Sequence, residues 1–160
     1  MPADAPAVHI RPYRKADADA TLDVFRAAVH GLAAAHYDER QRAAWAPDDL
    51  DAVAWAVRRA DADTVVAEVG DRVAGFSDVD RDGYIDMLFV HPDFARRGVA
   101  SALLRSVLER AREGGATVAS ANVSLTARPA FEKAGFSVQA TERVERNGVL
   151  LDRFRMSRPL

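Results

Sequence analysis

The sequence predicts an α/β fold in which a mixed sheet is covered by helices on both of its faces. Two observations carry this prediction. Segments with apolar residues at a period of two and segments with helical spacing follow one another in the order β-α-α-β-β-β-α-β-α-β-β. The segment from Tyr84 to Val90 is apolar on both sides, which is typical of a central strand buried on both faces.

The strands are predicted from their alternation and from the turns between them. Pro12 cannot donate to a ladder, so the strand that contains it is expected at a sheet edge. Asp82-Gly83 and Asn147-Gly148 both signal hairpins, and the second pair favours a two-residue turn. The expected strands are 8–13, 64–69, 72–77, 84–90, 117–123, 136–145 and 149–156.

The helices are predicted from apolar spacing and from the residues that begin and end them. Asp17 or Asp19 can cap the first helix, and Pro47-Asp48-Asp49 is expected to start another that ends near Arg58-Arg59. A long helix is stopped by Gly114-Gly115. Its apolar stripe consists of Leu103, Leu104, Val107, Leu108 and Ala111, and a short helix follows from Ala127 to Ala134.

Composition narrows the function classes. The chain has 160 residues, which fits one domain, and its net charge of −2 favours neither nucleic acid nor an anionic membrane as partner. It contains no cysteine, which excludes disulfides, cysteine-ligated metals and cysteine nucleophiles. Met1 to Pro12 carries no apolar signal core, and no stretch approaches the roughly 20 apolar residues that span a bilayer. We therefore expect a cytoplasmic protein.

The most informative segment runs from Leu88 to Leu104, where a strand leads through a loop into a helix. Gly98 and Ala100 lie in the first turn of that helix, where free N–H groups and small side chains suit a phosphate. Arg96 and Arg97 add positive charge beside it. The alternative is a surface loop with two solvated arginines before an ordinary helix.

This segment resembles motif A of the GCN5-related N-acetyltransferase (GNAT) superfamily, whose loop pattern is Gln/Arg-x-x-Gly-x-Gly/Ala. The segment from Ala127 to Phe136 resembles motif B, and the element order is similar over the whole chain. Tyr37, Ala44-Trp45-Ala46-Pro47 and Ile85-Asp86 resemble a YafP-like bacterial subgroup.

The resemblance implies a single acetyltransferase domain over residues 1–160, with a central, mostly antiparallel twisted sheet of about seven strands. It also implies acetyl-CoA as co-substrate, no metal, and a small-molecule or peptide amine as acceptor. Nucleic acid and membranes are not expected as partners, and a homodimer stays open. The cofactor-binding residues implied are Leu88, Phe89, Val90, Arg96, Arg97, Gly98, Val99, Ala100, Ser101, Ser124, Arg128 and Phe131.

Three positions depart from the family pattern. The loop begins with Ala95 in place of Gln or Arg, and Arg96 is expected to supply the missing charge. Ser124 stands where motif B usually has Asn. Phe131 stands where the family commonly has a Tyr that protonates the leaving thiolate, so the usual general acid is absent.

Asp86 is the candidate general base, because it is a carboxylate on an otherwise apolar strand two residues before the pantetheine-binding stretch. Partial desolvation would raise its pKa toward a useful value. The alternative is an aspartate satisfied by a neighbouring amide or arginine. Tyr84 is expected on the same face, where it either positions the substrate amine or packs as an aromatic.

Tyr37 and Trp45 are candidate substrate-binding residues, since amphipathic aromatics suit a small-molecule pocket. The alternative is an aromatic cluster that seals helices onto the sheet. Asp78 to Gly83 matches the first half of an EF-hand loop, but Phe89 replaces the required bidentate Glu, so calcium binding is not expected. No metal-ligand spacing is seen among His9, His30, His36 and His91.

The sequence therefore predicts an acetyl-CoA-dependent N-acetyltransferase that acts by direct attack of the amine in a ternary complex. A non-catalytic acyl-CoA-binding or regulatory module is the alternative, favoured by Phe131 and Ser124. A dinucleotide-binding module is disfavoured, because the acid that would bind the ribose is missing from the βαβ unit.

Overall fold

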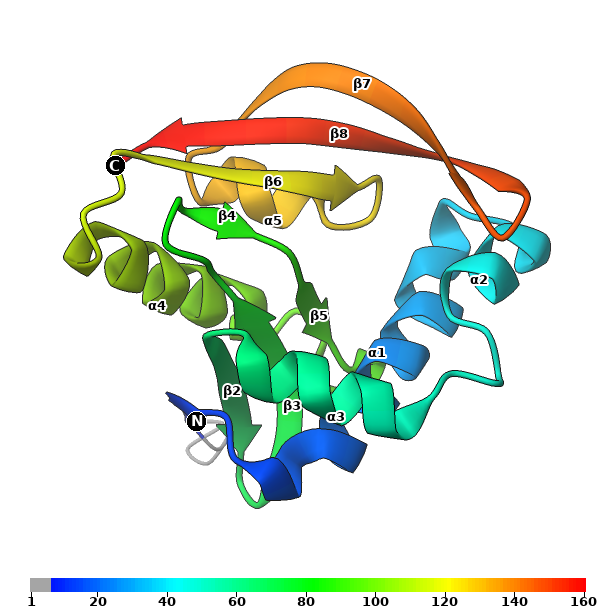
Figure 1. Ribbon diagram of the computed structural model, residues 1–160, viewed down its shortest axis with the longest axis horizontal. Helices are drawn as coiled ribbons and strands as arrows, with labels where there is room; N and C mark the ends of the chain where they lie inside the picture. Colours follow the sequence, from blue (N-terminus) through cyan, green and yellow to red (C-terminus); the bar gives the residue numbers. More distant parts are fainter. Residues whose placement is uncertain (1–6) are drawn as a thin grey trace, which may run out of the picture.

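Two sheets of four strands each form the framework of the molecule in a computed structural model that describes residues 7–160 (Figure 1). Their strand orders are β1-β2-β3-β5 and β4-β6-β8-β7, and every pairing is antiparallel except β4 with β6. Residues 1–6 lie outside the described residues. They belong to the predicted domain and to the segment from Met1 to Pro12 in which no signal core is expected. The strands are β1 (Val8–Pro12), β2 (Thr64–Val69), β3 (Arg72–Asp78), β4 (Tyr84–Ile85), β5 (Leu88–Val90), β6 (Val118–Ser124), β7 (Ser137–Arg146) and β8 (Val149–Pro159).

Helices cover both faces of the first sheet, as the sequence predicts. One core cluster joins α4 to strands of both sheets and contains Val65, Leu103 and Met156. A second cluster packs α1 and α3 against the sheet and contains Phe25, Trp55 and Val66. Val66 follows Val65 on β2, so its side chain lies on the opposite face of the sheet. The α/β class with helices on both faces is therefore confirmed. The helices are α1 (Ala18–His30), α2 (Glu39–Trp45), α3 (Ala52–Asp61), α4 (Val99–Glu113) and α5 (Arg128–Lys133), with short 3-10 turns at Lys15–Asp17, Leu32–Ala35 and Pro92–Phe94.

The predicted central strand from Tyr84 to Val90 is instead two strands, so the fold has eight strands among the described residues. Asp78 at the end of β3 causes the break, because its carboxylate accepts hydrogen bonds from the backbone N–H groups of Asp86 (2.9 Å) and Met87 (3.1 Å). The chain therefore leaves its pairing with β6 and joins β3. The residues of β5 are half-buried, not fully buried as expected, since one edge of the strand is open.

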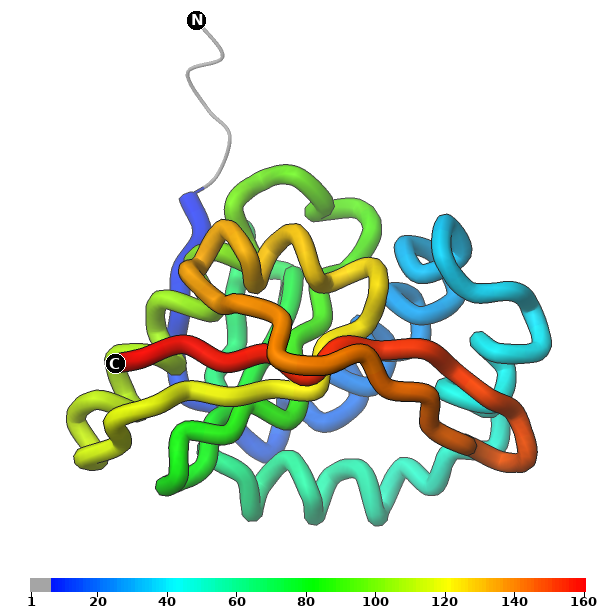
Figure 2. Tube along the Cα trace, turned by 90° about the horizontal axis from the view of Figure 1, so that it is seen from above, coloured from blue at the N-terminus to red at the C-terminus, as the bar shows by residue number. Residues whose placement is uncertain are grey.

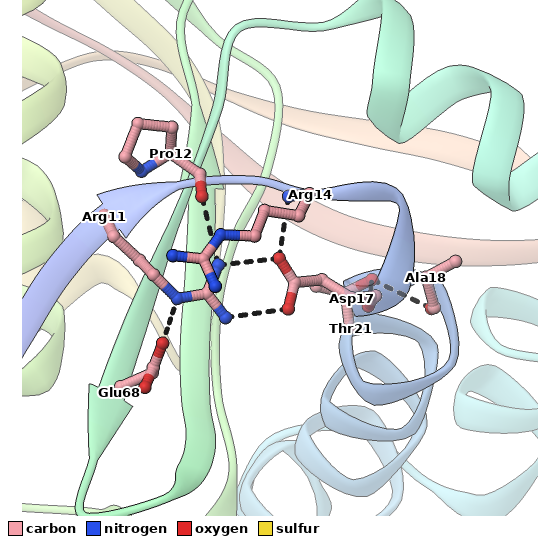
Figure 3. A network of polar contacts seen from close by, with 7 residues as sticks. All are labelled: Arg11, Pro12, Arg14, Asp17, Ala18, Thr21 and Glu68. Atoms are coloured by element: carbon pink, nitrogen blue, oxygen red, sulfur yellow. Dashed lines mark hydrogen bonds and ion pairs between the residues drawn. The ribbon is translucent and has the colours of Figure 1, made fainter.

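Two helix starts differ from the prediction. Asp51, and not Pro47, begins α3, since its carboxylate accepts the N–H groups of Val53 and Ala54. Asp17 holds the predicted N-cap position of α1, but its side chain does not cap the helix, because its carboxylate accepts bonds from both terminal nitrogens of Arg11 at 2.8 Å and from the Arg14 N–H at 2.7 Å (Figure 3). The pKa of Asp17 is lowered mainly by its bonds to Arg11. This network holds the start of α1 on β1 and β2, where Arg11 also pairs with Glu68.

The two predicted hairpin turns have different outcomes. Asn147 and Gly148 have φ values of 49° and 78°, as a two-residue hairpin turn between β7 and β8 requires. This hairpin extends to α2 (Figures 1 and 2), where Asn147 Nδ2 donates to the Ala44 carbonyl at 2.8 Å. Asp82-Gly83 also turns, with Gly83 at φ 84°, but its flanking strands do not pair with each other. The hairpin expected there is wrong, because β4 pairs with β6.

Candidate active site

A cleft of about 540 Å³ opens where β5 and β6 part. Its walls come from both sheets, α1, α2, α3 and the β7–β8 hairpin, which brings segments from most of the chain to one site. The structure thus brings together half of the predicted site residues. Those that line the cleft are Tyr37, Trp45, Tyr84, Asp86, Leu88, Phe89, Ser124 and Phe131.

Open strand edges face this cleft. The Met87 carbonyl accepts a hydrogen bond from β3, and the His91 N–H donates one to β3. Hydrogen-bonded residues alternate in an antiparallel pair, so the backbone N–H and carbonyl of Phe89 also bond to β3. The backbone groups of Leu88 and Val90 therefore point to the open edge of β5. On the other side, the pairing of β6 with β4 ends at Ala121, which leaves that edge of residues 122–124 uncovered by β4. A ligand arm that contains amide groups can hydrogen-bond to these open edges in the way that an added strand would.

The N-terminus of α4 holds most of the remaining predicted residues. Gly98 has φ 79°, Arg96 has φ 61°, and the first helical bond runs from the Ala102 N–H to the Gly98 carbonyl. The N–H groups of Val99, Ala100 and Ser101 thus precede the helical ladder, and together with the helix dipole they suit an anion. Arg96 is exposed, and the guanidinium of Arg97 lies 5.6 Å from the Phe94 ring centroid.

Asp86 and Tyr84 both line the cleft. Asp86 is exposed to the cleft, yet the protein atoms packed around it, and then the charge of Asp78, raise the pKa of its carboxyl. Tyr84 is half-buried, and its hydroxyl accepts a hydrogen bond from Asn122 Nδ2 at 3.0 Å, which leaves its own proton unused. Burial, followed by the charge of Asp86, raises the pKa of Tyr84. The site therefore presents one proton acceptor and one neutral hydroxyl.

Comparison with known proteins decides the family. A family model described as an acetyltransferase (GNAT) domain matches residues 33–158. The uncharacterized N-acetyltransferase YafP of Escherichia coli (strain K12) is 36% identical over 150 residues, which cover 93% of this chain and 94% of YafP. This chain belongs to the GNAT family of acetyltransferases. The predicted family, its YafP-like character and the enzyme class are confirmed.

Solved GNAT structures agree with this assignment. A GCN5-related N-acetyltransferase from Rhodopseudomonas palustris superposes with a TM-score of 0.91 at 32% identity, covering 100% of this chain and 99% of that one. The putative acetyltransferase YncA from Salmonella typhimurium, solved with its cofactor acetyl-CoA, has a TM-score of 0.72 at 23% identity. That alignment covers 96% of this chain and 94% of YncA, and it shows a shared fold.

Three predicted cofactor-binding residues lie in α5 or just before it, and each contacts other residues of the protein. Ser124 Oγ accepts the Ala127 N–H at 3.0 Å and so caps the segment that leads into α5. Arg128 pairs with Glu132 at 2.8 Å and lies 4.6 Å from the centroid of the Phe154 ring. Phe131 is only 3% exposed and offers no hydroxyl where the family commonly has Tyr. Cofactor contacts for these three residues stay predictions.

The two candidate substrate-binding aromatics differ. The Tyr37 hydroxyl donates to the Asp152 carbonyl at 2.6 Å and accepts the Leu125 N–H at 2.9 Å, so it ties the segment just before α2 to β8 and to the residue that follows β6. Burial raises the pKa of Tyr37. Trp45 is half-buried, packs edge-on against Tyr37 at 5.4 Å between ring centroids, and lines the cleft. Tyr37 thus has a structural role, and it supports the Trp45 ring that lines the cleft.

Several residues of this region were not predicted. The sequence marks Asp78 only as the first residue of the partial calcium-loop motif, but its carboxylate pairs with buried Arg59 at 2.7 Å. Arg58 and Arg146 both line the cleft, from α3 and from the end of β7. A buried aspartate directly after an apolar strand was the available signal for Asp78. No local pattern marks the two arginines, because the fold brings them together over 88 residues of chain.

Two further findings concern the described residues. None of the helices within residues 7–160 is both long enough and apolar enough to cross a membrane. In the same range, no group of three or more His, Cys, Asp or Glu side chains is arranged to hold a metal ion.

Proposed function

We propose that this GNAT enzyme transfers the acetyl group of acetyl-CoA to the amine of an acceptor by direct attack in a ternary complex. The cleft supports this proposal, because it combines open strand edges with the Asp86 carboxylate. Unused N–H groups at the start of α4 lie just beyond the end of β5. These parts match the needs of a thioester with an amide-containing arm and a pyrophosphate.

Each part of the cleft then has a role. The N–H groups of Val99, Ala100 and Ser101, with Arg96, would hold the pyrophosphate. The open edge of β5 would pair with the amides of pantetheine. A backbone N–H of Leu88 or Val90 would donate to the oxygen that becomes negative as the amine attacks, since the N–H of Phe89 is used by β3.

The chemistry needs one proton acceptor. The amine nitrogen forms a bond to the acetyl carbon, the carbon–sulfur bond breaks, and Asp86 takes the amine proton. The leaving thiolate needs no dedicated acid, because a thiol of pKa about 8.5 is a tolerable leaving group. Tyr84, next to Asp86, would position the amine through its hydroxyl.

A non-catalytic acyl-CoA-binding module is the second candidate, favoured by the missing hydroxyl at Phe131. Incubation with acetyl-CoA and a panel of amines separates the two. Release of CoA thiol together with an acetylated amine, detected by mass spectrometry, supports the enzyme. Tight CoA binding without amine-dependent release supports the module.

The extent of the domain belongs to the same proposal. Residues 1–160 would form one acetyltransferase domain, because a single core cluster contains residues from both sheets and from α4. A cytoplasmic location stays a prediction from the sequence.

A further inference from the structure

Two arginines that line the cleft have no side-chain partner among residues 7–160. Arg58 on α3 and Arg146 at the end of β7 line the same cleft as Asp86. Across residues 7–160, neither guanidinium makes a hydrogen bond or an ion pair with another residue. Arg153, by contrast, lines the cleft but already pairs with Glu142 at 3.1 Å. Both unpaired charges are near enough to Asp86 to lower the pKa of its carboxyl against the stronger effect of burial.

The acidic residues of the cleft do not neutralise these arginines. Asp152 is bound to Arg143 at 2.8 Å. Glu145 directly precedes Arg146 on β7, so the two side chains leave opposite faces of the strand. The cleft that Asp86 lines therefore also carries two exposed arginines with no acidic partner within residues 7–160.

One part of the cleft wall is apolar. Four large apolar side chains line this part. They are Trp45 of α2, Leu50 of the loop before α3, Met87 between β4 and β5, and Phe89 of β5. A volume of about 540 Å³ lies in the range of small-molecule sites. Beside the pantetheine arm on β5, the cleft thus offers a proton acceptor, two cations and an apolar wall to a small acceptor.

We propose that the acceptor is a small amine that also carries a carboxylate or another anionic group and an apolar body, as in a hydrophobic amino acid. Asp86 receives the amine, and Arg58 and Arg146 receive the anion, by charge-assisted hydrogen bonds. A polyamine is disfavoured, because its additional positive charges would face the two arginines. This inference rests on the proposed acetyl transfer for its placement of the amine.

Phenylalanine and methionine are suitable probes, each compared with its carboxamide, which keeps the amine and the body but loses the negative charge. We expect the acids to be acetylated with higher kcat/KM than the carboxamides. Arg146→Gln and Arg58→Gln should each raise KM for the acids about 10-fold or more and leave the carboxamides unchanged. Arg40→Gln, an exposed arginine of α2 that does not line the cleft, is the matched control and should change neither.

Calorimetric titration of the same acids into the CoA-bound protein measures acceptor binding without acetyl transfer. It therefore tests the anion site separately from the proposed function. Preferential binding of the acids that is lost in Arg146→Gln, without any transfer, would support the anion site and contradict the enzyme. Transfer that favours the carboxamides, or equal losses for both forms in the arginine variants, would overturn the anion site and leave the enzyme intact. Failure of both acids to bind at millimolar concentration would also overturn it.

Discussion

At the scale of single residues, Asp86 carries the proton transfer in this account. Asp86→Asn preserves the shape and removes the acceptor, so kcat/KM at neutral pH should fall roughly 10²-fold or more. CoA affinity should barely change, because the proposed pyrophosphate site lies at the start of α4. Steady-state kinetics and a CoA titration measure the two quantities. Equal activity of variant and wild type from acidic to basic pH would reduce Asp86 to a structural residue.

The pH profile gives a second test of the same residue. Burial and the charge of Asp78 raise the pKa of Asp86 above its ordinary value of 3.8. A base works only when deprotonated, so kcat/KM should decrease as the pH falls through this raised pKa. The resulting acidic limb should therefore lie above the ordinary aspartate range and should vanish in Asp86→Asn. A limb that persists unchanged in the variant would assign it to another group.

Phe131 tests whether the absent acid matters. The ring is buried, lines the cleft and packs edge-on against Phe136 at 5.0 Å between centroids. Phe131→Tyr adds a hydroxyl with little change in volume, so kcat should stay the same or rise. Phe131→Ala is the control for packing and should lower the free energy of unfolding by about 3–5 kcal/mol. A large loss of kcat in folded Phe131→Tyr would reveal a role for the bare ring.

At the scale of elements, the turn before α4 depends on Gly98 for its backbone. No heavy atom lies within 4 Å of a Cβ built at Gly98, but its φ of 79° is unfavourable for other residues. Gly98→Ala should therefore cost only about 1–2 kcal/mol of stability and keep CoA binding. Gly98→Glu should also abolish the rise in Tm that CoA produces, because it adds negative charge at the proposed phosphate site. An undiminished CoA shift in Gly98→Glu would move the pyrophosphate elsewhere.

The junction of β3, β4 and α3 depends on a buried ion pair. Asp78 accepts from Arg59 and also holds the amides that separate β4 from β5. Arg59→Met leaves that carboxylate unpaired and should cost about 3–5 kcal/mol in chemical denaturation. Adding Asp78→Asn should cost less than the sum of the two single changes, because the unpaired charge is then removed. Strict additivity would mean that the pair contributes nothing as a unit.

At the scale of the whole molecule, the sequence predicted the fold class and most of the order of elements, but it missed α2 as a separate helix and joined β4 and β5 into one strand. Periodicity places Leu103 and Val66 in the core because burial of a helix stripe or strand face is a local pattern. The break at Met87 depends on a carboxylate nine positions earlier in the chain, and no periodicity encodes such a contact. For the same reason the motif predicted the α4 turn, while the arginines that face Asp86 became visible only in the fold.

The proposed transfer requires acetyl-CoA to occupy the cleft between β5 and β6. A crystal structure of the protein grown with CoA tests this most directly. We expect the pantetheine amides to bond to the open edge of β5 at Leu88 or Val90, the pyrophosphate to lie on the N–H groups at the start of α4, and the thiol to lie within reach of Asp86. CoA bound away from this cleft, or a cleft that stays empty at saturating CoA, would contradict it.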